Sequence, residues 1–154
     1  MHKPRLRRLD WVFLRAPIYF VTACTHSRAP WLACSEVHET LVSFFSRGAE
    51  GGAFVGCYVL LPDHLHLFVS FRPGSLQLSA WMKSLKNTLS KTLRGMGKPA
   101  PHWQDGFFDH VLRSSESYEQ KWLYVRDNPV RAGLVSQADD WPYQGEIHCC
   151  SAGL

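Results

Sequence analysis

Residues 54–71, FVGCYVLLPDHLHLFVSF, decide the fold. Two runs rich in β-branched and aromatic residues, 54–61 and 65–71, are separated by Pro62, Asp63 and a histidine. Such runs favour strands, and a short turn-forming link between them predicts a tight antiparallel hairpin. The second strand of this hairpin carries paired histidines, which are the first candidates for chemistry.

The segments on either side of the hairpin complete the fold. Residues 17–24 and 103–113 are predicted strands, because both are rich in strand-forming residues. Helices are predicted where apolar residues recur at helical spacing, over 35–48, over 76–94, and from 115 to Asp127 or Asn128. The order strand, helix, strand, strand, helix, strand, helix predicts an α+β, ferredoxin-like fold. We expect a four-stranded antiparallel sheet with two helices on one face and an extra C-terminal helix.

Length and composition indicate one globular domain. The chain has 154 residues, of which 45% are hydrophobic and 19% charged, so it can bury a full core. We expect a single domain over 1–154, with a basic extension at 1–15 and a flexible tail at 144–154. Five cysteines without a CxxC pair indicate reduced thiols and therefore a cytoplasmic protein. No apolar run reaches the roughly 18 residues of a membrane span, and Arg15 and Pro17 interrupt the one stretch that resembles a signal peptide.

The distribution of charge points to a polyanionic partner. The net charge is only +4, but no acidic residue lies between Asp63 and Asp105. Basic residues fall in this window and at the amino terminus, a pattern that suits nucleic acid, although a solvated helix face and a basic tail explain it equally well. The candidate DNA-binding residues are Arg5, Arg7, Arg8, Lys83, Lys86, Lys91 and Arg94.

His64 and His66 are candidate metal ligands. Alternate residues of a strand share a face, so both imidazoles point to the same side of the sheet, while the leucines between and beside them enter the core. Imidazole binds several divalent metals. On spacing alone, two unrelated surface histidines remain an alternative.

Tyr124 is a candidate nucleophile on the last predicted helix. Helical spacing places it with Gln120 and Asn128 on a polar face, separate from an apolar stripe that makes Tyr118 a core residue. A displayed phenol beside an amide suits covalent catalysis next to a metal. An ordinary surface tyrosine has the same spacing.

Five blocks of the sequence together resemble the REP-associated tyrosine transposases, a family of single-tyrosine HUH transposases. They are YFVTACTHSRAPWL from Tyr19, LPDHLHLFV from Leu61, WQDGFFDHVLR from Trp103, YVRDNPVRAGLV from Tyr124, and WPY ending at Tyr143. The resemblance covers most of the chain, and it depends on the order and spacing of the blocks.

The resemblance implies a set of site residues. His64 and His66 would be ligands of a divalent metal, Mg²⁺ or Mn²⁺, and Tyr124 the catalytic tyrosine. Asn128 stands where this family offers a third, polar ligand. His110 and Gln120 are candidates for support around the site, with His110 also a possible substitute ligand.

The activity implied is cleavage and strand transfer on single-stranded DNA through a covalent 5′-phosphotyrosine, on palindromic hairpin repeats. The protein would act as a monomer or a loose homodimer. Two alternatives stay open at this point. One is a non-catalytic DNA-binding module. The other is a phosphodiesterase that uses water with His64, His66 and His110, against which we expect Asp63 and Asp109 to point away from the histidines.

Overall fold

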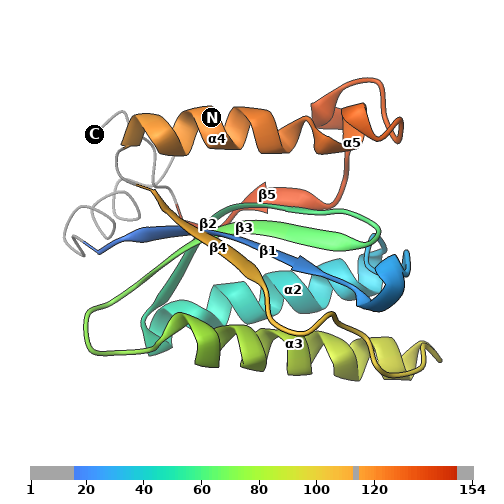
Figure 1. The fold of residues 1–154 in the computed structure, drawn as a ribbon, viewed down its shortest axis with the longest axis horizontal. Coiled ribbons are helices and arrows are strands. Elements are labelled where there is room, and N and C mark those ends of the chain that lie inside the picture. Colours follow the sequence, from blue (N-terminus) through green and yellow to red (C-terminus); the bar gives the residue numbers. More distant parts are fainter. Residues whose placement is uncertain (1–15, 113–114, 149–154) are drawn as a thin grey trace.

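A computed structural model describes residues 16–112 and 115–148. Its centre is one antiparallel sheet of five strands in the order β4-β1-β3-β2-β5, with helices on both faces (Figure 1). The strands are β1 (Ile18–Cys24), β2 (Ala53–Leu60), β3 (His64–Phe71), β4 (Phe108–Leu112) and β5 (Gln144–Glu146). The helices are α2 (Ser35–Gly48), α3 (Leu78–Gly95), α4 (Ser115–Arg126) and α5 (Asn128–Arg131), with short 3-10 turns η1 (His26–Arg28), η2 (Ala49–Gly51) and η3 (Ala138–Asp140).

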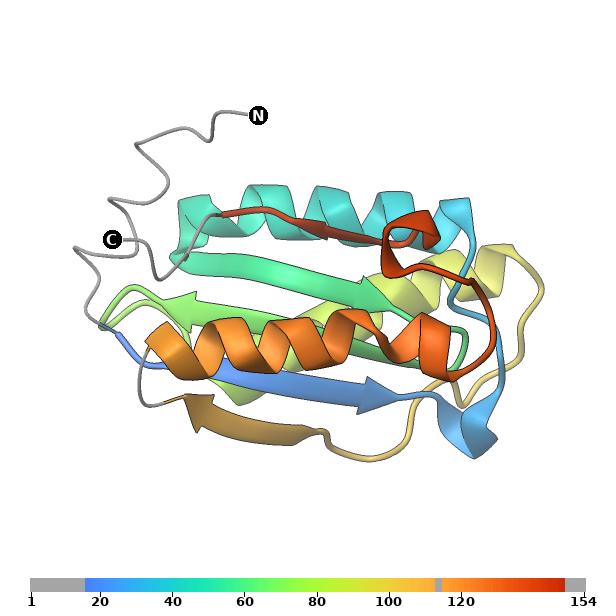
Figure 2. The ribbon, with the colours of Figure 1, turned by 90° about the horizontal axis from the view of Figure 1, so that it is seen from above.

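The ferredoxin-like prediction is confirmed for the four long strands and the two helices beneath them. α2 and α3 lie side by side under one face of the sheet, and α4 runs over the other (Figures 1 and 2). The apolar stripe of α3 is buried against the sheet, which is what an amphipathic helix achieves by covering a core. Its buried residues include Trp81, Met82, Leu85, Leu89 and Leu93.

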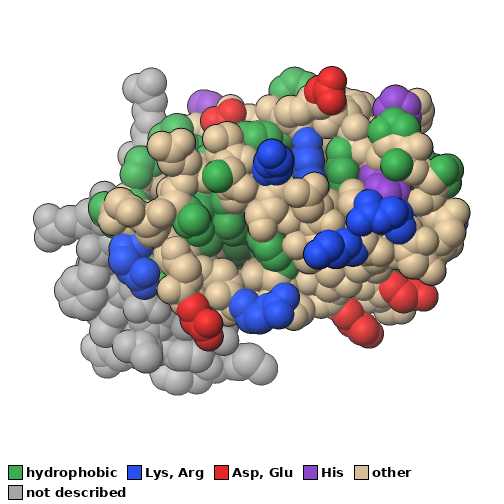
Figure 3. All heavy atoms as spheres, turned by 90° about the horizontal axis from the view of Figure 1, so that it is seen from below, with side chains coloured by type: hydrophobic (Ala, Val, Ile, Leu, Met, Phe, Trp, Pro, Cys, Tyr) green, Lys and Arg blue, Asp and Glu red, His purple; other side chains and the backbone are tan. Residues whose placement is uncertain are grey.

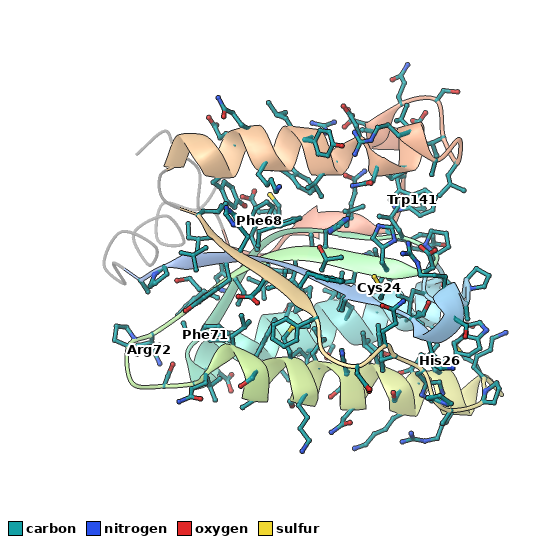
Figure 4. All side chains as sticks on the ribbon, in the orientation of Figure 1. Cys24, His26, Phe68, Phe71, Arg72 and Trp141 are labelled. Atoms are coloured by element: carbon teal, nitrogen blue, oxygen red, sulfur yellow. The ribbon has the colours of Figure 1, made fainter. Side chains whose placement is uncertain are left out.

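Side chains along β3 alternate between two hydrophobic cores, one on each face of the sheet. Phe68 points toward α4 and Phe71 toward α3 (Figure 4). On β2 the register shifts between Val55 and Tyr58, so that both of these residues pack on the α2 and α3 side. A bulge of this kind inserts one residue and changes which face the following side chains take. The backbone N–H of Cys57, inside the bulge, donates to the Tyr118 hydroxyl at 3.0 Å, which confirms Tyr118 as a core residue.

The prediction of a flexible tail at 144–154 is wrong for its first residues. Gln144–Glu146 form β5 against β2, and the N–H groups of Ile147 and His148 donate to the carbonyls of Gly56 and Val55. Edge pairing of this kind needs only backbone groups, so it leaves little trace in side-chain composition. Residues 149–154 and the predicted extension at 1–15 lie outside the described residues.

The boundaries of β4 and α4 differ from prediction. β4 begins at Phe108, because Trp103 makes only an isolated bridge to Thr25 before the chain reaches the sheet edge. α4 ends at Arg126, and Pro129 then enters the first turn of α5, where a proline N–H is not needed.

Two expectations from composition can be compared with the structure. Among the described residues, Cys24 and Cys34 are free thiols. Within the described ranges, no helix combines the length and the apolar character that crossing a bilayer requires.

Candidate functional site

His64 and His66 face α4 from the start of β3. Their ring centroids are 4.8 Å apart, and register places His66 opposite Thr22 on β1. The His66 ring stacks on Phe20 at 5.3 Å, and Phe20 in turn contacts Phe68 under α4. The prediction that both imidazoles share one side of the sheet is therefore confirmed. We call this side, marked by His64, His66, Thr22 and Phe20, the histidine face.

The Nδ1 atoms of both imidazoles are engaged by neighbouring side chains. Nδ1 of His66 lies 2.8 Å from the Thr22 hydroxyl, and Nδ1 of His64 lies 2.7 Å from the Asp63 carboxylate. When Nδ1–H donates to such partners, the lone pair is left on Nε2. The donor set thus suits a metal, since two adjacent imidazoles offer Nε2 atoms oriented by their partners.

The contact with Asp63 corrects an expectation. Strand alternation predicts that Asp63 points away from the histidines, but β3 begins only at His64, so alternation does not govern Asp63. Its carboxylate also accepts from Nε of Arg28 at 3.0 Å. Burial opposes ionisation, yet the hydrogen bonds from Arg28 and His64 hold the pKa of Asp63 below its usual value. Asp109 does point away, because it pairs with Val21 of the opposite core.

His66 is held neutral. Burial lowers its pKa to about 3, and the positive charges of His64, Lys121, Arg131 and Arg28 act in the same direction. A neutral imidazole keeps the lone pair that a metal needs, so the chemistry of His66 suits a metal at ordinary pH.

Asn128, at the start of α5, offers an oxygen. Its Nδ2 donates to the Val125 carbonyl at 2.9 Å, which leaves Oδ1 as the available amide atom. Within residues 16–112 and 115–148, no group of three or more His, Cys, Asp or Glu side chains could hold a metal ion. His110 therefore does not join the paired histidines as a third ligand, and an amide is the kind of donor that can.

Tyr124 projects from the exposed flank of α4. Its side chain is 64% exposed, and it lines a shallow groove of about 310 Å³ with His110, Leu112, Gln120 and Lys121. The guanidinium of Arg131 lies 4.0 Å from the centre of the Tyr124 ring. Because Val125, the next residue, packs with Val59, which pairs with His66, the tyrosine end of α4 lies over the histidine face.

The edge strand β4 adds two residues to the histidine face. His110 pairs with Phe20 and Phe108 pairs with Thr22, so both side chains share the side of the imidazoles. His110 thus belongs to the groove of Tyr124. Phe108 is an aromatic side chain with 69% of its surface exposed.

The basic residues proposed from sequence lie elsewhere. α3, with Lys83, Lys91 and Arg94, covers the opposite face of the sheet, and Figure 3 shows Lys and Arg side chains spread over that side. Lys86 is half-buried, and its ammonium donates to the carbonyls of Gln104, at 3.1 Å, and Gly106. Lys86 thus holds the 103–107 loop on α3, and burial lowers its pKa. Arg5, Arg7 and Arg8 lie outside the described residues.

Three cations that the sequence analysis did not select surround the site instead. Arg28 comes from η1, Lys121 from α4 and Arg131 from α5. Arg28 and Arg131 lie in sequence blocks quoted above, and Lys121 lies three residues before Tyr124. Because they are single basic residues in three separate segments, they do not form a run of charge in the sequence. The spacing of charges along the chain could not have found them.

No family model matches the chain. It is 28% identical over 91 residues to a REP-associated tyrosine transposase of Escherichia coli strain K12, a match that covers 58% of this chain and 52% of that protein. It is 24% identical over 142 residues to a Haemophilus influenzae protein that bears the same name provisionally, covering 85% of this chain and 80% of that one. The chain is thus similar in sequence to REP-associated tyrosine transposases. It spans about half the length of the first of these curated relatives.

A solved structure has a similar fold. A REP-associated tyrosine transposase bound to a REP hairpin superposes with a TM-score of 0.69 at 23% identity, over 84% of this chain and 76% of that one. At this identity the likeness concerns the fold. The resemblance to REP-associated tyrosine transposases noted from the five sequence blocks is confirmed by these comparisons.

Proposed function

We propose that the protein cleaves and rejoins single-stranded DNA by transesterification, with Tyr124 as nucleophile. One observation carries the proposal: the helix that displays Tyr124 packs over the face from which two imidazoles offer their Nε2 atoms. The homologues named as transposases support the same reaction class.

His64, His66 and the amide oxygen of Asn128 would hold the metal, Mg²⁺ or Mn²⁺. When bound, the cation neutralises charge on the non-bridging oxygens of the scissile phosphate. Thr22 and Asp63 orient the two imidazoles through Nδ1, which keeps each Nε2 directed at the site.

The Tyr124 hydroxyl attacks phosphorus, so that a bond from Oη to phosphorus forms as the bond to the 3′ oxygen breaks. His110 lines the same groove and can accept the phenol proton, while the leaving 3′ oxygen takes a proton from water. A 5′-phosphotyrosine and a free 3′-hydroxyl result. A second 3′-hydroxyl can reverse the chemistry, so rejoining needs no nucleotide cofactor.

The proposed substrate is an unpaired segment beside a DNA hairpin. Phe108 offers an exposed ring on which one base can stack. The solved relative bound to a REP hairpin supports a hairpin substrate. Lys83, Lys91 and Arg94 would contact only a hairpin long enough to reach the far side of the sheet. We further propose a cytoplasmic protein that acts as a monomer or loose homodimer.

A labelled hairpin oligonucleotide incubated with the protein and Mg²⁺ or Mn²⁺ tests the proposal. We expect a protein–DNA adduct that survives a denaturing gel, absent in Tyr124→Phe and retained in Tyr19→Phe, a tyrosine on the opposite side of the sheet. Free 5′-phosphate product without adduct would instead favour hydrolysis by water. Binding without any product would favour a non-catalytic DNA-binding module.

A further inference from the structure

We infer that Arg28, Lys121 and Arg131 form a phosphate clamp that binds the DNA backbone on either side of the scissile phosphate. The inference rests on the proposed function and names the part of the substrate that each residue contacts. These three residues, called the clamp below, come from three separate elements and meet at the histidine face.

Arg28 is placed beside His64 by an uncommon backbone conformation. Ser27 and Arg28 both have φ of 54°, in the left-handed region that non-glycine residues seldom occupy. The buried Thr25 supports this turn, since its hydroxyl contacts the carbonyls of Ala29 at 2.9 Å and Asp63 at 3.1 Å. Sparsely populated conformations that the surrounding structure maintains are common at functional sites.

Only some of the N–H groups of the Arg28 guanidinium are hydrogen-bonded within the protein. Nε donates to Asp63, and one terminal nitrogen lies 3.4 Å from Nδ1 of His64. The side chain is 53% exposed. Because Nδ1 of His64 is already engaged by Asp63, the terminal N–H groups of Arg28 remain available to an anion bound beside the imidazoles.

Lys121 and Arg131 reach the histidine face from α4 and α5. Nζ of Lys121 lies 4.9 Å from the centre of the Phe20 ring, which itself stacks on His66. Arg131 lies over Tyr124. Neither cation forms an ion pair with a carboxylate in the described part of the chain, whose ion pairs join Arg28 and His64 to Asp63 and Arg126 to Asp139.

The charge balance around the imidazoles favours an anion. In the described part of the chain, Arg28 lies beside His64 and Asp63, Lys121 lies over the Phe20 ring that stacks on His66, and Arg131 lies over Tyr124. Cations gathered around a partly buried site stabilise a bound phosphate. A single strand carries one phosphate per nucleotide, so it can place successive phosphates at Arg28, at the metal site and at the two residues of α4 and α5.

Salt dependence of binding measures the clamp without any need for catalysis. The probe is fluorescein-labelled octathymidylate, titrated with the full chain in EDTA from low to moderate salt. Each phosphate contact contributes about 0.7 to the slope of log affinity against log salt for a single strand. We expect the triple variant Arg28→Gln, Lys121→Gln, Arg131→Gln to lose about 2 from this slope.

The matched control removes the same charge from the opposite side of the sheet. Lys83→Gln, Lys91→Gln, Arg94→Gln on α3 should leave the slope for octathymidylate unchanged. Arg28→Lys should keep the slope yet bind more weakly, because it keeps the charge and loses the fork of donors. This variant also serves if Arg28→Gln unfolds, which thermal unfolding would reveal.

The outcomes separate the clamp from the proposed function. An unchanged slope in the clamp triple variant, or an equal loss in the α3 control, overturns the inference. If the parent chain still forms the Tyr124 adduct in that case, the proposed function stands without the clamp. Failure of the parent to form any adduct, with the slope lost as expected, leaves the clamp and removes the catalysis.

Discussion

Nδ1 of His66 and the hydroxyl of Thr22 lie 2.8 Å apart across two neighbouring strands. This contact fixes the ring of His66 and, when Nδ1 carries the proton, leaves Nε2 as the nitrogen that could bind the proposed metal. Thr22 is not itself a proposed ligand, so its effect on metal binding can be separated from that of the proposed ligands.

Replacing Thr22 with valine should weaken Mn²⁺ binding by about 10- to 100-fold, because valine has the same shape but cannot hold Nδ1. Thr22→Ser keeps the hydroxyl and should bind Mn²⁺ as the parent does. Calorimetric titration measures the affinity. Equal affinity in the parent and in Thr22→Val would show that the contact does not orient the ligand.

Phe108→Ala should weaken binding of single-stranded DNA by an amount that corresponds to the loss of one stacked base, about 1–3 kcal/mol. Val111→Ala provides the control, since Val111 is also exposed but pairs with Tyr19 and faces the other side of the strand. Fluorescence anisotropy with an octanucleotide compares the two variants. If both lose affinity equally, the ring of Phe108 is not a stacking surface.

The pair His38 and Tyr58 should make stability depend on pH. Nε2 of His38 lies 2.8 Å from the Tyr58 hydroxyl, and burial lowers the pKa of His38 and raises the pKa of Tyr58 to about 12. Below pH 6.5 the unfolded chain binds more protons at His38 than the folded chain does. The free energy of unfolding therefore decreases as the pH is lowered, by at most about 1.4 kcal/mol per pH unit. Above pH 10 the unfolded chain loses its Tyr58 proton first, so stability falls as pH rises.

Urea unfolding across pH tests both arms. His38→Gln should flatten the acid side of the profile relative to the parent, and Tyr58→Phe should flatten the alkaline side. Identical slopes in parent and variant on either side would contradict the corresponding assignment.

Gly52→Ala should destabilise the fold by about 1–3 kcal/mol. Gly52 has φ of +98°, and a Cβ there would lie 2.6 Å from Cβ of Ser75. Gly97 also has a positive φ, +80°, but open space around it. Gly97→Ala should therefore lose less, which thermal unfolding of the two variants can establish.

The sequence predicted those parts of the fold that periodicity controls. Alternation along the second hairpin strand placed His64 and His66 on one side, and helical spacing separated Tyr118 from Tyr124. Periodicity fails where an element has just begun or ended, which is why the face of Asp63 was predicted wrongly. It also gives no sign of β5, because three edge residues pair through their backbone alone.

Contacts between side chains and segments that lie far apart in the sequence could not be predicted either. The amphipathic pattern of α3 places Lys86 on a polar face but does not show that the 103–107 loop covers it. The left-handed turn that aims Arg28 at His64 depends on contacts with Thr25, which become visible only once β1 and β3 are paired.

The segment that follows α5 connects the helix of Tyr124 to the sheet a second time. Nε1 of Trp141 donates to the Leu60 carbonyl at 3.0 Å, and the Leu60 N–H donates to the Tyr143 carbonyl at 2.8 Å. β5 then pairs with β2. If this helix were exchanged with another copy of the chain, these hydrogen bonds would have to break and buried backbone groups would lose their partners. Tyr124 therefore stays in the same subunit as His64 and His66 unless these hydrogen bonds break.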